Sequence, residues 1–290
     1  MVIVKLKGGL GNQMFQYALG RSLSLKYQTD LKLDLSFFNL NIKKITKRDY
    51  NLNVFNIKTE LAGQKEIPLL NRIIGRGLLG FILGKILKYI PVLNKGLERG
   101  FNFNENIMSL GPDVYLDGYW QSYKYFSDFE DEIKKDFTFK NNFSEKVIEL
   151  SGEIKSSNSL CVHVRRGDYL KNNIHESLSK DYYLKGFEEV NLKQKIDKVY
   201  IFSDDINWCK SNLQFSTPVV FVGNEYSGEI GEGHMFLMSK CQNFIIANST
   251  FSWWASWLSK REDKLVVVPE RWFKDGSKVD DLIPEDWIKI

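Results

Sequence analysis

The stretch Leu160-Cys-Val-His-Val-Arg-Arg-Gly-Asp-Tyr169 indicates how the chain folds. It begins as a strand, because apolar valines alternate with His163 and Arg165, which share one face. Gly167 ends the strand directly after two adjacent arginines. Open α/β folds bind ligands at the carboxyl ends of their strands, so the stretch predicts guanidinium groups at a binding edge. Guanidinium stays charged and binds phosphate through paired hydrogen bonds. Surface arginines at an ordinary strand end are the alternative interpretation.

Strands and helices alternate on both sides of this stretch. The other expected strands cover residues 2–6, 31–35, 198–202, 219–222, 244–247 and 265–268, with one more beginning at residue 114. Such alternation predicts an α/β fold with parallel sheets in two Rossmann-like halves. A run of serine and asparagine at residues 156–159 marks a boundary, so we expect one domain at 1–157 and a second at 158–290.

Composition narrows the classes of function. The 290 residues suit two domains, and 43% hydrophobic with 26% charged residues is ordinary globular composition. The net charge of +4 does not indicate nucleic acid, but it suits a polyanionic ligand or an anionic membrane surface. Cys161, Cys209 and Cys241 lie far apart in apolar surroundings, which predicts buried thiols in a reducing compartment. The N-terminus lacks the features of a signal peptide, so we expect a cytoplasmic location.

Residues 67–93 are rich in apolar side chains but carry Arg72, Arg76, Lys85 and Lys88. These charges leave no apolar run of about 20 residues, so a transmembrane helix is not expected. Two interpretations stay open. The segment is either a basic amphipathic stretch on the inner face of the cytoplasmic membrane or one or two core-packed surface helices.

Two further loops follow predicted strands and open helices. Gly8-Gly-Leu-Gly-Asn-Gln13 matches neither the Walker nor the dinucleotide fingerprint, so a tight turn and an anion-binding loop fit equally. Residues 248–252 place several hydroxyl and amide groups at one helix start, whereas capping needs only one. This second loop therefore predicts a phosphate site made by Asn248, Ser249, Thr250 and Ser252. Trp253 and Trp257, four residues apart, are expected in the core.

Ser203-Asp204-Asp205 follows another predicted strand. Two adjacent aspartates on an extended segment diverge, and no further carboxylate cluster supplies ligands, so no metal site is expected. One aspartate is expected to cap a helix, and the other to accept hydrogen bonds from a base or ribose. His163 either donates to a phosphate or is a buried, satisfied histidine. Together these features predict a nucleotide diphosphate neutralised by arginines and helix ends.

Several motifs carry a family resemblance. Residues 163–169 resemble the signature of fucosyltransferases that use GDP-fucose. Residues 8–17 and 245–254 resemble the bacterial-type α-1,2-fucosyltransferase family in particular, and 118–122 and 202–205 add to the match. The resemblance extends from residue 2 to about residue 272.

The resemblance implies a GT-B-like fold, with two Rossmann-like domains facing across a cleft. It implies metal-independent, inverting transfer of L-fucose from GDP-β-L-fucose to the 2-hydroxyl of a terminal β-galactoside, in the synthesis of an O-antigen-like surface polysaccharide. The domain at 1–157 would bind the acceptor and the domain at 158–290 the donor. No cofactor other than the donor substrate is implied.

The resemblance also implies roles for individual residues. Arg165 or Arg166 would bind the diphosphate, and Asn12 and Gln13 would lie near the fucose and phosphates. The remaining donor contacts would come from His163, Ser203, Asp204, Asp205, Asn248, Ser249, Thr250 and Ser252.

The general base is expected just beyond the arginines. Asp168, His175 and Glu176 lie there, and we assign the base to Asp168 or His175. One position departs from the family pattern: His234 stands where an acidic residue is common, so Glu232 is the candidate for the guanine contact. A non-catalytic nucleotide-sugar or glycan-binding protein and a peripheral membrane scaffold are the alternative functions.

Overall fold

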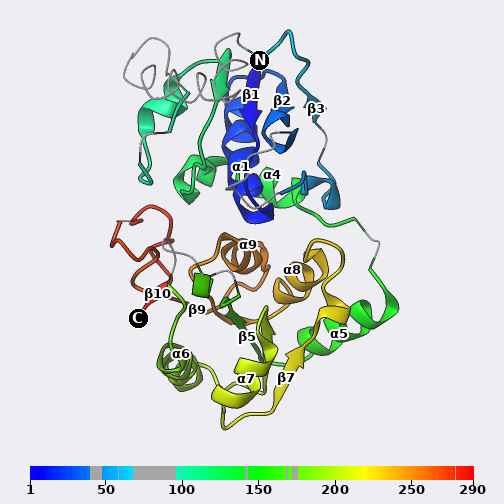
Figure 1. The fold of residues 1–290 in the computed structure, drawn as a ribbon, viewed down its shortest axis with the longest axis vertical. Coiled ribbons are helices and arrows are strands. Elements are labelled where there is room, and N and C mark those ends of the chain that lie inside the picture. The colour runs from blue at the N-terminus through cyan, green and yellow to red at the C-terminus, as the bar shows by residue number, and fades with distance from the viewer. Residues whose placement is uncertain are drawn as a thin grey trace. The chain divides into compact units, whose positions relative to one another are not determined.

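The computed structural model describes residues 1–39, 48–57, 59–67, 96–98, 100–140, 143–167, 169–171, 176–277 and 279–290. It divides into two compact units (Figure 1). Unit 1 comprises Met1–Thr138 and Val279–Ile283, and unit 2 comprises Phe139–Lys278 and Pro284–Ile290. Both units are built on a parallel sheet, as expected from the sequence.

The division between the units lies earlier than the expected boundary at residue 157. Helix α5 (Glu145–Lys155) belongs to unit 2 because it packs against α8 (Glu232–Met238). Just before α5, the ring of Phe143 stacks on Phe236 of α8 with centroids 4.2 Å apart. Near the C-terminus, Asp281 belongs to unit 1, where it accepts a hydrogen bond from the Phe103 amide at 2.9 Å.

Unit 1 contains a four-stranded sheet in the order β3-β2-β1-β4. The strands are β1 (Val2–Lys5), β2 (Leu31–Asp34), β3 (Glu60–Leu61) and β4 (Val114–Leu116). The helices are α1 (Leu10–Lys26), η1 (Ser36–Asn39), η2 (Leu52–Val54), η4 (Glu105–Ser109), η5 (Tyr123–Tyr125), η6 (Ser127–Phe129) and α4 (Glu130–Asp136). The strand order reverses between β1 and β4, so the carboxyl ends of these two strands form a topological switch point.

Helix α1 lies close against β1 and β2 because it has a glycine where it touches them. A Cβ atom on Gly20 would collide with the Val4 side chain and lie 2.9 Å from Cδ1 of Leu31. Gly152 in α5 is not in close contact with a neighbour, because a Cβ there would meet no atom within 4 Å.

We expect Gly20→Ala and Gly152→Ala to change stability in opposite directions. Gly20→Ala overpacks a close contact and should lower the free energy of unfolding by about 1–3 kcal/mol. Gly152→Ala lies inside an exposed helix and should raise it by roughly 0.5–1 kcal/mol. Urea-unfolding midpoints check both, and equal effects at the two sites would contradict the close packing of α1.

Unit 2 contains a six-stranded parallel sheet in the order β10-β9-β8-β5-β6-β7. The strands are β5 (Ser159–Val164), β6 (Lys198–Ser203), β7 (Val219–Val222), β8 (Asn243–Ile245), β9 (Val266–Val268) and β10 (Ile288–Lys289). The remaining helices are η7 (Tyr169–Lys171), α6 (Lys180–Lys193), α7 (Ile206–Asn212), η8 (Asn224–Tyr226) and α9 (Thr250–Leu258). The order reverses between β5 and β8, which is the switch point of this unit.

Helices cover both faces of the unit 2 sheet (Figure 1). Val162 and Val164 of β5 pack in one core cluster with Tyr183 of α6 and Cys209 of α7. His163, between the two valines, points to the opposite face, where its ring lies beside α9. This alternation confirms the faces predicted for the strand, and every residue of β5 is buried.

Other sequence predictions have clear outcomes. Trp253 and Trp257 are buried, as expected, and Cys161, Cys209 and Cys241 are free and buried. Residues 68–93 lie outside the described residues, so membrane contact by this segment stays a prediction. Within the described part of the chain, no helix has the length and apolar character needed to span a bilayer.

Candidate active site

The arginine loop and the polar corner that starts α9 follow neighbouring strands. Strand β5 leads into Arg165, and β8 leads into Asn248 and the start of α9. The two strands pair in parallel, with Val162 opposite Ile245. Because parallel strands end at one edge, both motifs lie at the switch point of the unit 2 sheet, where such folds bind ligands.

Asp204 shapes the arginine loop. Its carboxylate accepts hydrogen bonds from the amides of Arg166 at 2.9 Å and Gly167 at 3.1 Å. It also forms an ion pair with Arg165, with Nη1 and Oδ2 3.2 Å apart. The carboxylate is thus engaged by the loop itself, and its contact with the nucleoside stays a prediction.

Asp205 caps a helix, as expected for one of the two aspartates. Its Oδ1 accepts a hydrogen bond from the Trp208 amide at 3.1 Å at the start of α7. The hydroxyl of Ser203 accepts one from the Asp205 amide at 2.8 Å. The second carboxylate oxygen of Asp205 lies 3.3 Å from Nε of Arg166.

The two arginines differ in their surroundings. The Arg166 guanidinium lies 4.1 Å from the centre of the Trp208 ring and donates to the Ser177 hydroxyl at 3.1 Å. Its side chain is 17% exposed, whereas that of Arg165 is 32% exposed. Arg166 is therefore held in place by Trp208 and Ser177. Arg165 has the more solvent-accessible side chain of the two.

His163 is buried, and its Nδ1 has no hydrogen-bond partner among the described residues. Its ring centroid lies 6.0 Å from that of Phe251 in the first turn of α9. Burial, with the nearby charge of Arg165 and the neighbouring His234, lowers the pKa of His163 to about 3. The imidazole is therefore neutral near pH 7, and within the described part of the chain its Nδ1 lacks the partner that a satisfied histidine would have.

The depressed pKa of His163 predicts a pH-dependent contribution to stability. Folding favours the neutral ring, so the stabilisation is present above the ordinary pKa of 6.5 and is lost as the pH falls toward the folded pKa of about 3. We expect the advantage of the wild type over His163→Gln to shrink by about 2 kcal/mol between pH 6.5 and about pH 5. Urea unfolding across this range checks it, and parallel curves would contradict it.

The corner at Asn248 has a second buried polar atom without a partner. The Asn248 amide donates to the carbonyls of Glu176 at 3.2 Å and Trp272 at 2.9 Å, and its Oδ1 has no partner among the described residues. Ser249 is the N-cap residue of α9, yet its side chain makes no capping hydrogen bond. The Ser252 hydroxyl instead donates to the Ser249 carbonyl at 3.2 Å. Capping therefore does not explain why Asn248 and Ser249 stand here.

In the glycine loop of unit 1, the side chains of Asn12 and Gln13 make hydrogen bonds within the unit. Gly8 has a φ of +81°, and the Asn12 side chain lies where a Gly8 Cβ would be. Asn12 accepts a hydrogen bond from the Gln121 amide at 2.9 Å. Gln13 is fully buried and donates to the carbonyls of Gly8 and Asp49, at 3.0 and 2.9 Å. Gln13 therefore supports the loop with an inward-facing side chain, and its expected place beside the fucose stays a prediction.

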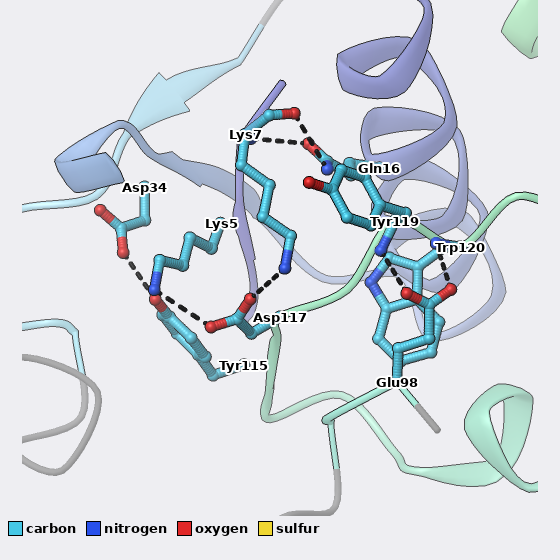
Figure 2. A network of polar contacts seen from close by, with 9 residues as sticks. All are labelled: Lys5, Lys7, Gln16, Asp34, Glu98, Tyr115, Asp117, Tyr119 and Trp120. Atoms are coloured by element: carbon cyan, nitrogen blue, oxygen red, sulfur yellow. Dashed lines mark hydrogen bonds and ion pairs between the residues drawn. The ribbon is translucent and has the colours of Figure 1, made fainter. Parts of the chain in front are cut away.

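A polar network at the switch point of unit 1 was not anticipated from the sequence (Figure 2). Asp117, just after β4, pairs with Lys5 at 3.1 Å and Lys7 at 2.8 Å. Burial opposes ionisation of Asp117, but the two lysines outweigh it and hold its pKa below the ordinary value. The partners are about 110 positions apart, so only the pairing of β1 with β4 brings them together.

The structure leaves the predicted general base and the predicted guanine contact untested. Asp168 and His175 lie outside the described residues, and Glu176 is exposed. The carboxylate of Glu232 accepts a hydrogen bond from the Ile230 amide at 2.9 Å, at the start of its own helix. His234 Nε2 lies 2.9 Å from the Gly223 carbonyl. No group of three metal-ligating side chains occurs among the described residues.

Comparison with solved structures places the fold. The chain is similar to the crystal structure of the α-1,6-fucosyltransferase NodZ soaked with GDP-fucose, with a TM-score of 0.53 at 15% identity. The match covers 89% of this chain and 91% of that one. A structure of NodZ from Bradyrhizobium matches with a TM-score of 0.52. The two parallel α/β units therefore define a GT-B-like fold.

Sequence comparisons add the activity class. An α-1,2-colitosyltransferase and an O-antigen biosynthesis glycosyltransferase of Escherichia coli are each 34% identical to this chain, the first over 100% of this chain and 99% of the relative, the second over 98% and 99%. A galactoside 2-α-L-fucosyltransferase of Caenorhabditis elegans is 28% identical over 59% of this chain and 48% of the relative. The protein is a GT-B-like glycosyltransferase. Residues 102–290 match glycosyl transferase family 11, and the chain belongs to that family.

Proposed function

We propose that this enzyme transfers L-fucose from GDP-β-L-fucose to the 2-hydroxyl of a terminal β-galactoside, with inversion, during synthesis of an O-antigen-like polysaccharide. One observation carries the proposal: the arginine loop and the start of α9 meet at the β5/β8 switch point. Two buried polar atoms that lack partners among the described residues, Nδ1 of His163 and Oδ1 of Asn248, lie near the end of β5 and just before α9. Both the charge and the unused hydrogen-bonding groups suit a diphosphate.

In this proposal Arg165 binds the diphosphate. As the bond between fucose and phosphate breaks, its electron pair moves to the phosphate oxygen, and the guanidinium stabilises the charge that develops there. Asp204 keeps Arg165 and the loop amides in place, and Arg166 is held against Trp208 as a support. The amides at the start of α9 add further donors.

Metal independence is part of the proposal, in which the Arg165 guanidinium and the amides at the start of α9 neutralise the diphosphate in place of a divalent cation. Incubation with GDP-fucose and lactose or N-acetyllactosamine, in the presence of chelator, should release GDP and yield an α-1,2-linked product. Release that requires added Mg²⁺ or Mn²⁺ would contradict metal independence. Tight GDP binding without turnover on any β-galactoside would instead favour the non-catalytic binding protein.

A colitosyl donor is the second candidate, because one of the two E. coli relatives is a colitosyltransferase. Colitose is L-fucose without its 3-hydroxyl, so the same diphosphate contacts serve both donors. A competition assay with GDP-fucose and GDP-colitose at equal concentration distinguishes them by the sugar found in the product. A product containing only colitose would replace the fucosyl assignment and leave the acceptor and linkage unchanged.

A further inference from the structure

A short segment of unit 1 runs beside β4 at the switch point of the sheet. Leu97 forms a parallel bridge with Asp117, and the Asp117 amide donates to the Gly96 carbonyl at 2.8 Å. This contact brings Glu98 to the same edge as Lys5, Lys7 and Asp117 (Figure 2). Ligands of open parallel sheets bind at this kind of edge.

Glu98 is held there by backbone amides. One carboxylate oxygen accepts a hydrogen bond from the Tyr119 amide at 2.6 Å, and the other accepts one from the Trp120 amide at 2.7 Å (Figure 2). Within the described part of the chain Glu98 has no ion pair, whereas Asp117 has two. Each oxygen of Glu98 keeps a lone pair for another donor, and the side chain is partly exposed.

The turn that holds Glu98 is costly to form. Trp120 has a φ of +56°, which a bulky residue rarely adopts, and its buried indole N–H has no partner among the described residues. A side chain on Gly118 would collide with both Glu98 and the Trp120 ring. Backbone strain and an unpaired buried N–H in one turn are typical of functional sites.

We propose that Glu98 is the general base that takes the proton from the acceptor hydroxyl, an assignment that rests on the proposed function. The acceptor oxygen bonds to C1 of the sugar while the bond between C1 and the phosphate oxygen breaks. The hydroxyl proton moves to the Glu98 carboxylate, and the electron pair of the broken bond leaves with GDP. Fixed by two amides, the carboxylate presents its remaining lone pairs without reorganisation.

The surrounding charges suit this role. Burial raises the pKa of Glu98 above its ordinary value, and the nearby Asp117 charge adds to the rise. The two amide hydrogen bonds and Lys7 act in the opposite direction, and Tyr125 also lies within electrostatic reach. A carboxylate with a raised pKa is a better proton acceptor than Asp117, whose pKa the lysines hold low.

The test compares Glu98→Gln and Glu98→Gly with the wild type for transfer, GDP affinity and melting temperature. We expect kcat/KM for transfer to fall by about 100-fold or more, with GDP affinity unchanged because the donor groups lie in unit 2. The acidic limb of the pH profile should disappear in Glu98→Gln, and added formate should partly restore transfer by Glu98→Gly. Glu66→Gln is the control, because Glu66 also accepts a backbone hydrogen bond, from Gly63 at 2.7 Å, and should keep full activity.

The outcomes separate this assignment from the proposed function. If the wild type transfers fucose but Glu98→Gln keeps its rate or its acidic limb, Glu98 is not the base and the proposed function stands. If Glu98→Gln and Glu98→Gly lose transfer together with a lowered melting temperature, and formate does not restore transfer, the assignment is also overturned. Glu98 would then only stabilise the fold. A wild type inactive on every β-galactoside would overturn both.

Discussion

Arg165→Ala should reduce fucosyl transfer by about 100- to 1000-fold, while the melting temperature changes little. The reason is that Arg165 is the more exposed cation of the loop and is proposed to stabilise the charge that develops on the leaving diphosphate. Removal of one well-placed donor of this kind commonly costs about 3–4 kcal/mol of transition-state stabilisation. Transfer rates with GDP-fucose and GDP affinity by calorimetry measure the effect.

Arg166→Ala provides the contrast. Arg166 packs on Trp208 and binds Asp205 and Ser177, so its loss should lower the melting temperature as well as the activity. Arg261→Ala is the matched control in the same unit, because among the described residues Arg261 makes one exposed hydrogen bond, to the Lys155 carbonyl at 2.7 Å. If Arg165→Ala turns over normally and Arg166→Ala folds normally but is inactive, the roles of the two arginines are reversed.

Trp253→Ala is expected to lower the free energy of unfolding by about 3–5 kcal/mol, the usual range for removing a large buried aromatic side chain. Trp253 is fully buried in α9, and its ring centroid lies 5.0 Å from that of Trp254 and 5.5 Å from that of Trp287. No small rearrangement of these large rings fills the space that the substitution leaves. Because α9 also begins at the corner where we propose that the diphosphate binds, GDP affinity should fall in the same variant.

Chemical denaturation, monitored by tryptophan fluorescence, measures the loss in the free energy of unfolding. Leu192→Ala is the control, because Leu192 is 83% exposed and its substitution removes almost no buried surface. A Trp253→Ala protein as stable as Leu192→Ala would show that the tryptophans of α9 do not anchor the helix. If the variant is destabilised but its GDP affinity is unchanged, the packing of α9 does not affect GDP binding.

The sheet and the donor-side motifs could be predicted because their signals are local. The strand of Val162 and Val164 alternates with period two, and its predicted faces are those observed. The capping role of one aspartate after β6 follows from short-range hydrogen bonding, and Asp205 performs it. The local sequence also indicates that residues 165 and 248 each follow a strand. Because the strands of a parallel sheet all end at the same edge, it follows that these two residues lie at one edge of the sheet.

The engagement of individual side chains could not be predicted in the same way. Asp204 turns back onto the arginine loop, 38 positions away from its Arg166 amide partner, and Gln13 turns inward to bind the Asp49 carbonyl. Both residues stand in motifs that resemble donor-binding sequences. Whether such a side chain faces a ligand or its own backbone depends on which donors and acceptors the fold leaves unpaired nearby, and a motif does not contain that information.

From the sequence alone followed the α/β class, most of the strands of the two sheets, the glycosyltransferase motifs and the positive charge of the loop after β5, whereas the short strands β3 and β10 were not predicted. These properties depend on side-chain periodicity and on charge, which neighbouring residues specify. The tertiary structure alone decided which arginine is accessible, which polar atoms stay unpaired, and that Glu98, Lys7 and Asp117 share one sheet edge. The physical reason is that accessibility, desolvation and pairing are set by contacts between segments far apart in the chain.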